Sequence, residues 1–197
     1  NTLLGCSLTI LGMPGDTEIL ILEMGTNSPG EISEMVASFK PTMGVITDVT
    51  EAHLQGLMTL DGVLRAKMEL LESPTMKFLT YNWDNVRLRD EVQKYSQKIT
   101  LSGVGFQGGY AQIEYPEFRI HEGEPLLHFR LNFPDYIINV QSRLFGSHQA
   151  LCLSMAMNVA HYLDIPLQSI PLQELDLRSL PGRGSLSYIQ EDNILVI

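Results

Sequence analysis

The sequence contains little cysteine and few positive charges. Its 197 residues include two cysteines, Cys6 and Cys152, which lie far apart and form neither a C-x-x-C pair nor a cysteine–histidine spacing suited to zinc. This usage excludes a disulfide framework and is typical of reduced thiols in a cytosolic protein. The 13 Lys and Arg residues against 23 Asp and Glu give a net charge of −10 and a pI near 4.8. A phosphate backbone would repel such a chain, so we expect no binding to nucleic acid.

The sequence also lacks long apolar runs and a phosphate-loop motif. No stretch reaches the ~18 apolar residues that a membrane helix requires, and no basic and apolar leader is visible, so we expect no membrane insertion. The pattern G-x-x-x-x-G-K-[ST] occurs nowhere in the chain. The chain begins at Asn1 and ends in the apolar, strand-like segment 193–197, and we therefore expect it to be a piece of a longer protein.

What is present is the pattern of a single α/β domain, with 44% apolar and 18% charged residues. Segment 18–23 (EILILE) is a nearly continuous apolar run, typical of a strand buried on both faces. A helix at 31–39, ended by Pro41, and a strand at 44–47 follow it, which makes a βαβ unit of a parallel sheet. The same alternation continues with helices predicted at 60–71 and 84–95 and strands at 78–81 and 99–102.

The pattern changes after Gly103. Residues 112–139 alternate between apolar and polar, with a turn at Gly123, which indicates a small antiparallel sheet with one wet face. A helical period returns at 147–163, and a turn follows at 181–184 (PGRG). The predicted fold class is therefore α/β, a mostly parallel sheet flanked by helices, with a small antiparallel sheet from about 105 to 139.

Four short motifs occur in order within 21–71. They are LEMG at 22–25, PGEI at 29–32, EAHL at 51–54 and RAKME at 65–69. Glu23 would lie at the carboxyl end of a strand, where α/β proteins bind ligands and where a carboxylate can hold Mg²⁺. His53 follows the second strand and can ligate a metal or contact a phosphate. Taken singly, Glu23, His53 and Lys67 are better explained as ordinary surface and loop residues.

Taken together, the motifs resemble the Mur ligase family. The segments LEMGTNSPGEI, TDVTEAHL and AKMEL are similar to its LEMGxxxPGEI, TNxxxAHL and AKxEL patterns, and the resemblance extends to 1–11 and 146–163. It implies a P-loop NTPase-like middle domain that binds ATP. It also implies that Glu23, His53 and a carbamylated Lys67 bind Mg²⁺, with Lys67 and His53 catalytic. Arg183 and His148 would lie near the phosphates and the adenine of the nucleotide, and Asp48 would also contact the nucleotide.

The implied reaction is an ATP-dependent amide ligation. The pattern is most similar to members that add D-alanyl-D-alanine to UDP-N-acetylmuramoyl-tripeptide (UDP-MurNAc-tripeptide) through an acyl phosphate, in peptidoglycan precursor synthesis. The resemblance implies a bacterial cytoplasmic enzyme, expected to be a monomer. The chain, 1–197, would be most of one middle domain, with the phosphate loop, the N-terminal UDP-binding domain and the C-terminal domain outside it. We expect this piece alone to be inactive.

Three positions depart from the family pattern and keep other functions open. Asp48 replaces an asparagine, which adds negative charge where ATP phosphates come close. Gln149 and Cys152 replace asparagines of a GxHNxxN segment, and cysteine is only a weak hydrogen-bond donor. The alternatives are another amino-acid-adding ligase of the family, or a degenerate ligase-like protein that binds a nucleotide without catalysis. A generic α/β nucleotide-binding domain would need several ordered matches to arise by chance.

Overall fold

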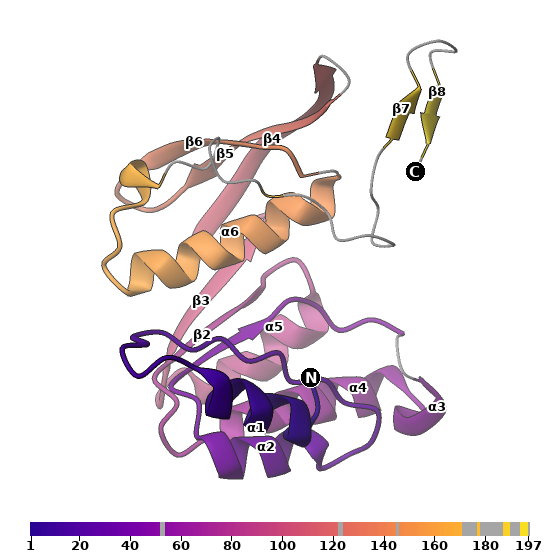
Figure 1. Ribbon diagram of the computed structural model, residues 1–197, viewed down its shortest axis with the longest axis vertical. Helices are drawn as coiled ribbons and strands as arrows, with labels where there is room; N and C mark the ends of the chain where they lie inside the picture. Colours follow the sequence, from indigo (N-terminus) through magenta and orange to yellow (C-terminus); the bar gives the residue numbers. More distant parts are fainter. Residues whose placement is uncertain are drawn as a thin grey trace. The chain divides into compact units, whose positions relative to one another are not determined.

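The computed structural model describes residues 1–51, 54–121, 124–144, 146–170, 177, 187–189 and 194–196. Six strands form one hydrogen-bonded sheet in the order β1-β2-β3-β4-β5-β6, with helices between β1 and β2 and between β2 and β3 in the chain (Figure 1). The predicted α/β class, with a mostly parallel sheet and a smaller antiparallel part, is confirmed.

The chain divides into two compact units. Unit 1 comprises Asn1–Leu79 and Asn85–Leu101, and unit 2 comprises Thr80–Asp84 and Ser102–Ile197. Two strands, β2 (Phe78–Asn82) and β3 (Thr100–Gly105), contribute residues to both units.

Unit 1 carries the four sequence motifs. Its helix α2 (Glu31–Phe39) begins after Gly30, whose φ of 89° is readily adopted by glycine, and buries Ile32, Met35 and Val36 against Cys6 of α1 (Leu3–Gly12). The other elements of unit 1 are β1 (Met43–Ile46), α3 (Leu54–Leu57), α4 (Leu60–Met68), the 3₁₀ helix η1 (Glu69–Glu72), α5 (Val86–Val92) and the 3₁₀ helix η2 (Gln93–Tyr95).

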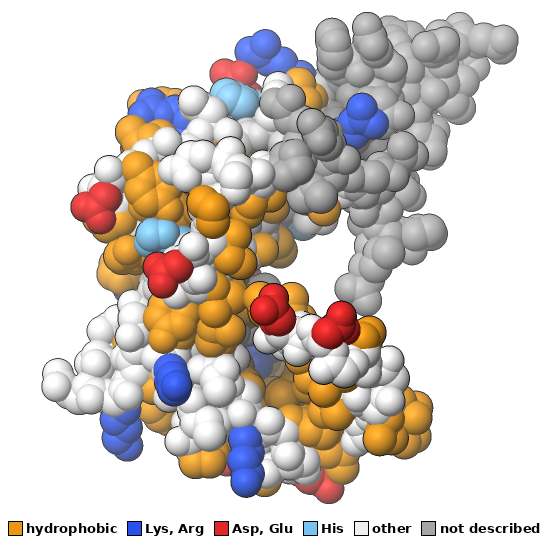
Figure 2. All heavy atoms as spheres, turned by 60° about the vertical axis from the view of Figure 1, so that its left-hand side comes forward, with side chains coloured by type: hydrophobic (Ala, Val, Ile, Leu, Met, Phe, Trp, Pro, Cys, Tyr) orange, Lys and Arg blue, Asp and Glu red, His pale blue; other side chains and the backbone are white. Residues whose placement is uncertain are grey.

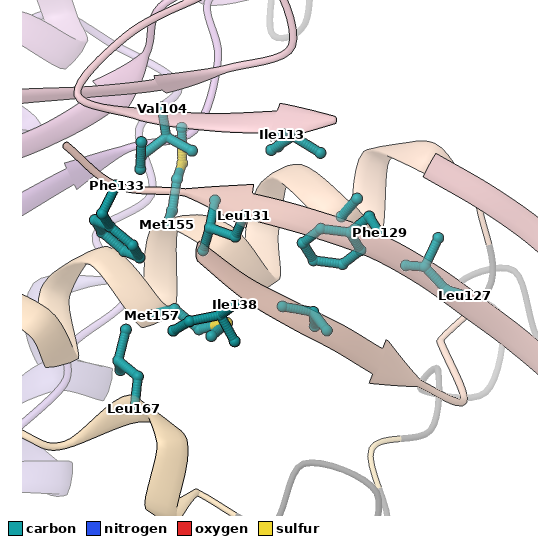
Figure 3. Close-up of a cluster of buried hydrophobic side chains, with 13 residues drawn as sticks. Val104, Ile113, Leu127, Phe129, Leu131, Phe133, Ile138, Met155, Met157 and Leu167 are labelled. Carbon is teal, nitrogen blue, oxygen red and sulfur yellow. The ribbon is translucent and has the colours of Figure 1, made fainter. Parts of the chain in front are cut away.

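Unit 2 is an antiparallel sheet covered by one long helix. Strands β4 (Ala111–His121), β5 (Glu124–Asn132) and β6 (Ile137–Ser142) pair antiparallel, and α6 (Ser147–Tyr162) packs on them. Figure 3 shows the core between them, where Phe129 and Leu131 of β5 and Met155 of α6 are buried. The remaining elements of unit 2 are η3 (Leu167–Ser169), β7 (Ser187–Ile189) and β8 (Ile194–Val196), and the last two form a separate antiparallel pair.

Most predicted elements are confirmed. The helix at 31–39 matches α2, and the helices predicted at 60–71 and 84–95 match α4 and α5, each continued by a 3₁₀ turn. The helix predicted at 147–163 matches α6, and the strand-like end at 193–197 contains β8. Helix α1 was not predicted. The turns at Gly123 and 181–184 lie outside the described residues.

The predicted strand at 18–23 is wrong. This segment forms neither a helix nor a strand and pairs with no strand in the described part of the chain, and Ile19 and Ile21 are 48% and 86% exposed. An apolar run is typical of a buried strand, but a strand also requires a neighbouring backbone that accepts and donates its hydrogen bonds. Within the described residues, no helix is long and apolar enough to cross a membrane.

A buried asparagine links α6 to β2 and β3 within unit 2. Asn158 is 1% exposed, and its Nδ2 donates to Thr80 Oγ1 at 2.8 Å and to Ser102 Oγ at 2.8 Å. Its Oδ1 lies 3.1 Å from Ser102 Oγ, which can donate to it. Thr80 and Ser102 are also buried, so their hydroxyls depend on this amide.

We predict that Asn158→Ala lowers the free energy of unfolding by about 2 to 4 kcal/mol, because it opens a cavity and leaves buried hydroxyls unpaired. Urea unfolding of the 197-residue chain measures the change. The matched control is Asn139→Ala, which removes an exposed side chain from β6 and should change stability by less than about 0.5 kcal/mol. Equal effects of the two substitutions would contradict the role given to Asn158.

Candidate active site

The amine of Lys67 joins the RAKME motif to the loop before EAHL. Lys67 lies near the end of α4, half-buried, and its Nζ donates to the backbone carbonyl oxygen of Asp48 at 2.5 Å. Burial lowers the pKa of Lys67 from its ordinary value, and the nearby Asp48 carboxylate opposes this by raising it. The structure therefore brings together two of the predicted site residues, Asp48 and Lys67, within unit 1.

The carboxylate of Asp48 is held by its own neighbourhood. Its Oδ1 accepts from the backbone N–H of Val49 at 2.8 Å and from Asn85 Nδ2 at 2.6 Å. Asn85 Nδ2 also donates to the carbonyl of Val49 at 3.0 Å. The aspartate that replaces the family's asparagine therefore serves as an acceptor inside the protein.

Two glutamates of the motifs cap the start of α2. Glu69 of the AKMEL segment accepts from Gly30 N at 2.8 Å and from Ser33 N at 3.0 Å, which ties the Lys67 segment to the PGEI segment. Glu31 accepts from Asn27 N at 2.7 Å and from Ser28 N at 3.1 Å. These two bonds lower the pKa of Glu31, and the bond from the Asn27 N–H has the larger effect. Of the N–H groups at this helix start, those of Gly30 and Ser33 are thus bonded to a carboxylate of the protein itself.

Helix α3 lies directly against the backbone between the first and second motifs. A Cβ added to Gly56 would lie 1.7 Å from the carbonyl oxygen of Asn27, a separation that no side chain can occupy. Similarly, a Cβ on Gly25 would lie 2.9 Å from Cγ of Asn1. Glycine at position 56 therefore lets the backbone of α3 approach the Asn27 carbonyl closely, and glycine at position 25 leaves room for the Asn1 side chain.

The other predicted site residues are placed as follows. Glu23 has an exposed side chain, and its backbone carbonyl accepts from Cys6 Sγ at 3.5 Å. His148 is exposed in the first turn of α6, in unit 2, whereas Glu23, Asp48 and Lys67 belong to unit 1. His53 and Arg183 lie outside the described residues. On α6, Gln149 is half-buried and Cys152 is exposed.

The donors fit Mg²⁺ only in part. Among the described residues, no three His, Cys, Asp or Glu side chains gather closely enough to hold a metal ion. The Glu23 carboxylate is a suitable hard ligand. Lys67 as an ammonium is not, because like charges repel, and it would fit only after conversion to an anion. On the face in Figure 2, the described Lys and Arg side chains are scattered and form no continuous basic patch.

Comparison with known proteins places the chain in a family. Residues 1–160 match the model of the Mur ligase middle domain. The chain therefore belongs to the Mur ligase family of ATP-dependent ligases, as its motifs predicted. Over 166 residues it is 41% identical to the UDP-N-acetylmuramoyl-tripeptide–D-alanyl-D-alanine ligase of Bacillus subtilis, covering 84% of this chain and 34% of that protein. The Escherichia coli ligase of the same name is 24% identical over 197 residues, covering 100% of this chain and 43% of that protein.

Solved structures of family members resemble this chain over nearly its whole length. MurF from Acinetobacter baumannii superimposes with a TM-score of 0.85 at 22% identity, covering 99% of this chain and 42% of that chain, which shows the shared fold. MurF from Thermotoga maritima in complex with ADP gives a TM-score of 0.80 at 25% identity, covering 94% of this chain and 42% of that chain. The chain thus spans between 34% and 43% of the length of these relatives.

Sequence reasoning alone did not find the residues that connect the motifs. Glu69 belongs to the AKMEL segment, but the sequence predicted no function for it, although an acidic residue is suited to a helix start. Asn85 is the second residue of the helix predicted at 84–95, whereas the structure makes it the N-cap of α5, a position that asparagine favours. Its second set of bonds, to the 48–49 segment, joins residues 36 or more positions apart and leaves no signal in a single sequence.

We predict that Glu31→Gln destabilises the chain at neutral pH and that the loss shrinks in acid. Since the folded protein lowers the pKa of Glu31, its carboxylate stabilises the fold above the ordinary value of 4.5. That contribution disappears as the pH falls through the lowered pKa of the folded state. Urea unfolding at pH 7 and pH 3 measures the difference.

The control for this measurement is Glu34→Gln, an exposed glutamate in the same first turn of α2. It shares the effect of the helix dipole but has no bond to the 27–28 backbone among those found for the described residues. A stability difference between wild type and Glu31→Gln that is the same at both pH values would contradict the assignment.

Proposed function

We propose that the protein containing this chain is an ATP-dependent ligase that adds D-alanyl-D-alanine to UDP-MurNAc-tripeptide. The observation that carries the proposal is the Lys67–Asp48 contact, which unites the AKMEL segment with the loop before EAHL inside one unit. The names of the Bacillus subtilis and Escherichia coli relatives support the substrates, and the ADP complex of the Thermotoga maritima relative supports nucleotide binding.

The proposed reaction has two steps. A terminal carboxylate oxygen of the tripeptide attacks the γ-phosphorus of ATP, the bond from this phosphorus to the bridging oxygen breaks, and the products are ADP and an acyl phosphate. The amine of D-alanyl-D-alanine then attacks the acyl carbon. Phosphate leaves from the tetrahedral intermediate, the nitrogen loses a proton, and an amide remains.

Conversion of Lys67 to a carbamate would give the predicted Mg²⁺ site a second anionic ligand beside Glu23. Burial lowers the pKa of Lys67, which increases the neutral amine that attacks the carbon of CO₂ and then loses a proton. The product is an anion with carboxylate-like oxygens. Together with Glu23 and His53 it would hold Mg²⁺, which supplies charge stabilisation to the transferring phosphoryl group. His148, Arg183 and Asp48 would contact the nucleotide.

The environment of Asp48 bears on the competing functions. A degenerate, non-catalytic protein was suggested because a carboxylate here would repel ATP phosphates. Two N–H donors bond this carboxylate, which reduces that objection. The other alternative is a ligase of the family with a different amino-acid substrate. The substrate assay below distinguishes that ligase from one that adds D-alanyl-D-alanine.

The architecture of the whole protein is part of the same proposal. This chain would be most of the middle domain, and a phosphate loop, a UDP-binding domain and a C-terminal domain would lie elsewhere in a monomeric cytoplasmic protein. The relatives are more than twice as long, which leaves room for these parts.

We predict that Lys67→Ala lowers ligation by the intact gene product at least about a hundredfold, because the cation site loses an anion. The assay measures phosphate release from ATP with UDP-MurNAc-tripeptide, with and without D-alanyl-D-alanine. Formate should restore part of the activity, since it supplies a carboxylate. Lys77→Ala, at an exposed lysine, is the control and should be neutral. Full activity of Lys67→Ala would refute the role of this residue.

We also predict that the 197-residue chain alone catalyses no ligation, because its sequence contains no phosphate-loop motif. The intact gene product serves as the positive control in the same assay. Phosphate release by the isolated chain that depends on both substrates would show that the middle domain needs no further segment.

A further inference from the structure

The side chain of Asn85 bonds to two separate parts of unit 1. It is the N-cap of α5, where its Oδ1 accepts from the backbone N–H of Leu88 at 3.1 Å. Its Nδ2 donates to Asp48 Oδ1 at 2.6 Å and to the carbonyl of Val49 at 3.0 Å. One amide therefore uses both its acceptor and its donors, and it connects the start of α5 to the 48–49 segment.

These bonds determine where the Asp48 carbonyl points. The Asp48 C=O and the Val49 N–H belong to one planar peptide unit, so fixing the N–H fixes the carbonyl. Asp48 Oδ1 accepts from that N–H at 2.8 Å, and Asn85 holds the same Oδ1. The opposite end of this peptide unit, the Asp48 oxygen, receives Lys67 Nζ. Val49 is 4% exposed, so water does not readily replace these contacts.

We propose that Asn85 is a positioning residue of the ligase site, which orients the Asp48 carbonyl and through it the side chain of Lys67. This inference rests on the proposed function, since it assigns Lys67 to the reaction. Among the hydrogen bonds of the described residues, none joins Asn85 to Lys67 itself, and the effect of Asn85 is transmitted through the Asp48–Val49 peptide.

The position requires an amide. Both partners of Nδ2, the Asp48 carboxylate and the Val49 carbonyl, are acceptors, so residue 85 must donate to them. Aspartate has almost the same shape but would bring a second carboxylate against Asp48 and leave the Val49 carbonyl without this donor. Aspartate is, however, an equally good N-cap. Asn85→Asp therefore keeps the cap of α5 and removes only the bonds to the 48–49 segment.

The test compares Asn85→Asp in two backgrounds of the intact gene product, one with Asp48 and one with Asp48→Asn. With Asp48 present, we expect Asn85→Asp to lower kcat about 10- to 100-fold, with a smaller change in KM for D-alanyl-D-alanine. With asparagine at position 48 the two carboxylates no longer meet, and the same change should lower kcat less than about fivefold. The matched control is Asn139→Asp, the same amide-to-acid change on exposed β6, which should have no effect.

Amide hydrogen exchange gives a measurement that does not depend on activity. In Asn85→Asp, the exchange of the Val49 N–H should accelerate at least about tenfold, while the Leu88 N–H should keep its protection because the cap remains. Equal kcat losses in the two backgrounds, or unchanged exchange at Val49, would overturn the inference. An inactive wild type would refute the ligase function and the catalytic part of the inference, and exchange at Val49 would still decide whether Asn85 holds the segment.

Discussion

The contact between the Lys67 amine and the Asp48 carbonyl is the interaction on which the candidate site depends. A lysine in a half-buried position loses hydration, and a backbone carbonyl is the neutral acceptor that compensates without neutralising the charge. The two residues come from different motifs, so the bond determines how the loop after β1 lies on α4. Asn85 on one side and Glu69 on the other then connect this pair to α5 and to α2.

The start of α2 shows how the same surface is arranged around negative charge. A helix N-terminus usually attracts anions, and one that follows a glycine turn in an ATP-binding family would be an obvious phosphate site. Here Glu31 and Glu69 already accept from the backbone N–H groups of residues 27, 28, 30 and 33. The glutamates of PGEI and AKMEL therefore stabilise the backbone around the start of α2.

The sequence predicted the elements well where local patterns decide them. Helix α2 combines a glycine turn, an apolar face and Pro41 as a stop, and its predicted bounds match the structure. Segment 18–23 failed because its pattern is apolar but its pairing partner cannot be inferred from a local window. Lys67 and Asp48 were predicted as site residues through the family resemblance, whereas Asn85 was not, because its bonds to the 48–49 segment form only in the folded chain.

The replacement of asparagine by aspartate at position 48 acquires a meaning in this arrangement. On the ligase proposal, carbamylation changes Lys67 from a cation to an anion, so its interaction with the Asp48 carboxylate changes from attraction to repulsion. Two N–H donors, from Val49 and Asn85, remain on that carboxylate and offset part of the repulsion. A divalent cation near Glu23 would offset the rest. On the same proposal, the aspartate would make the modified site more dependent on Mg²⁺ than an asparagine would, whereas its charge favours the unmodified, protonated lysine.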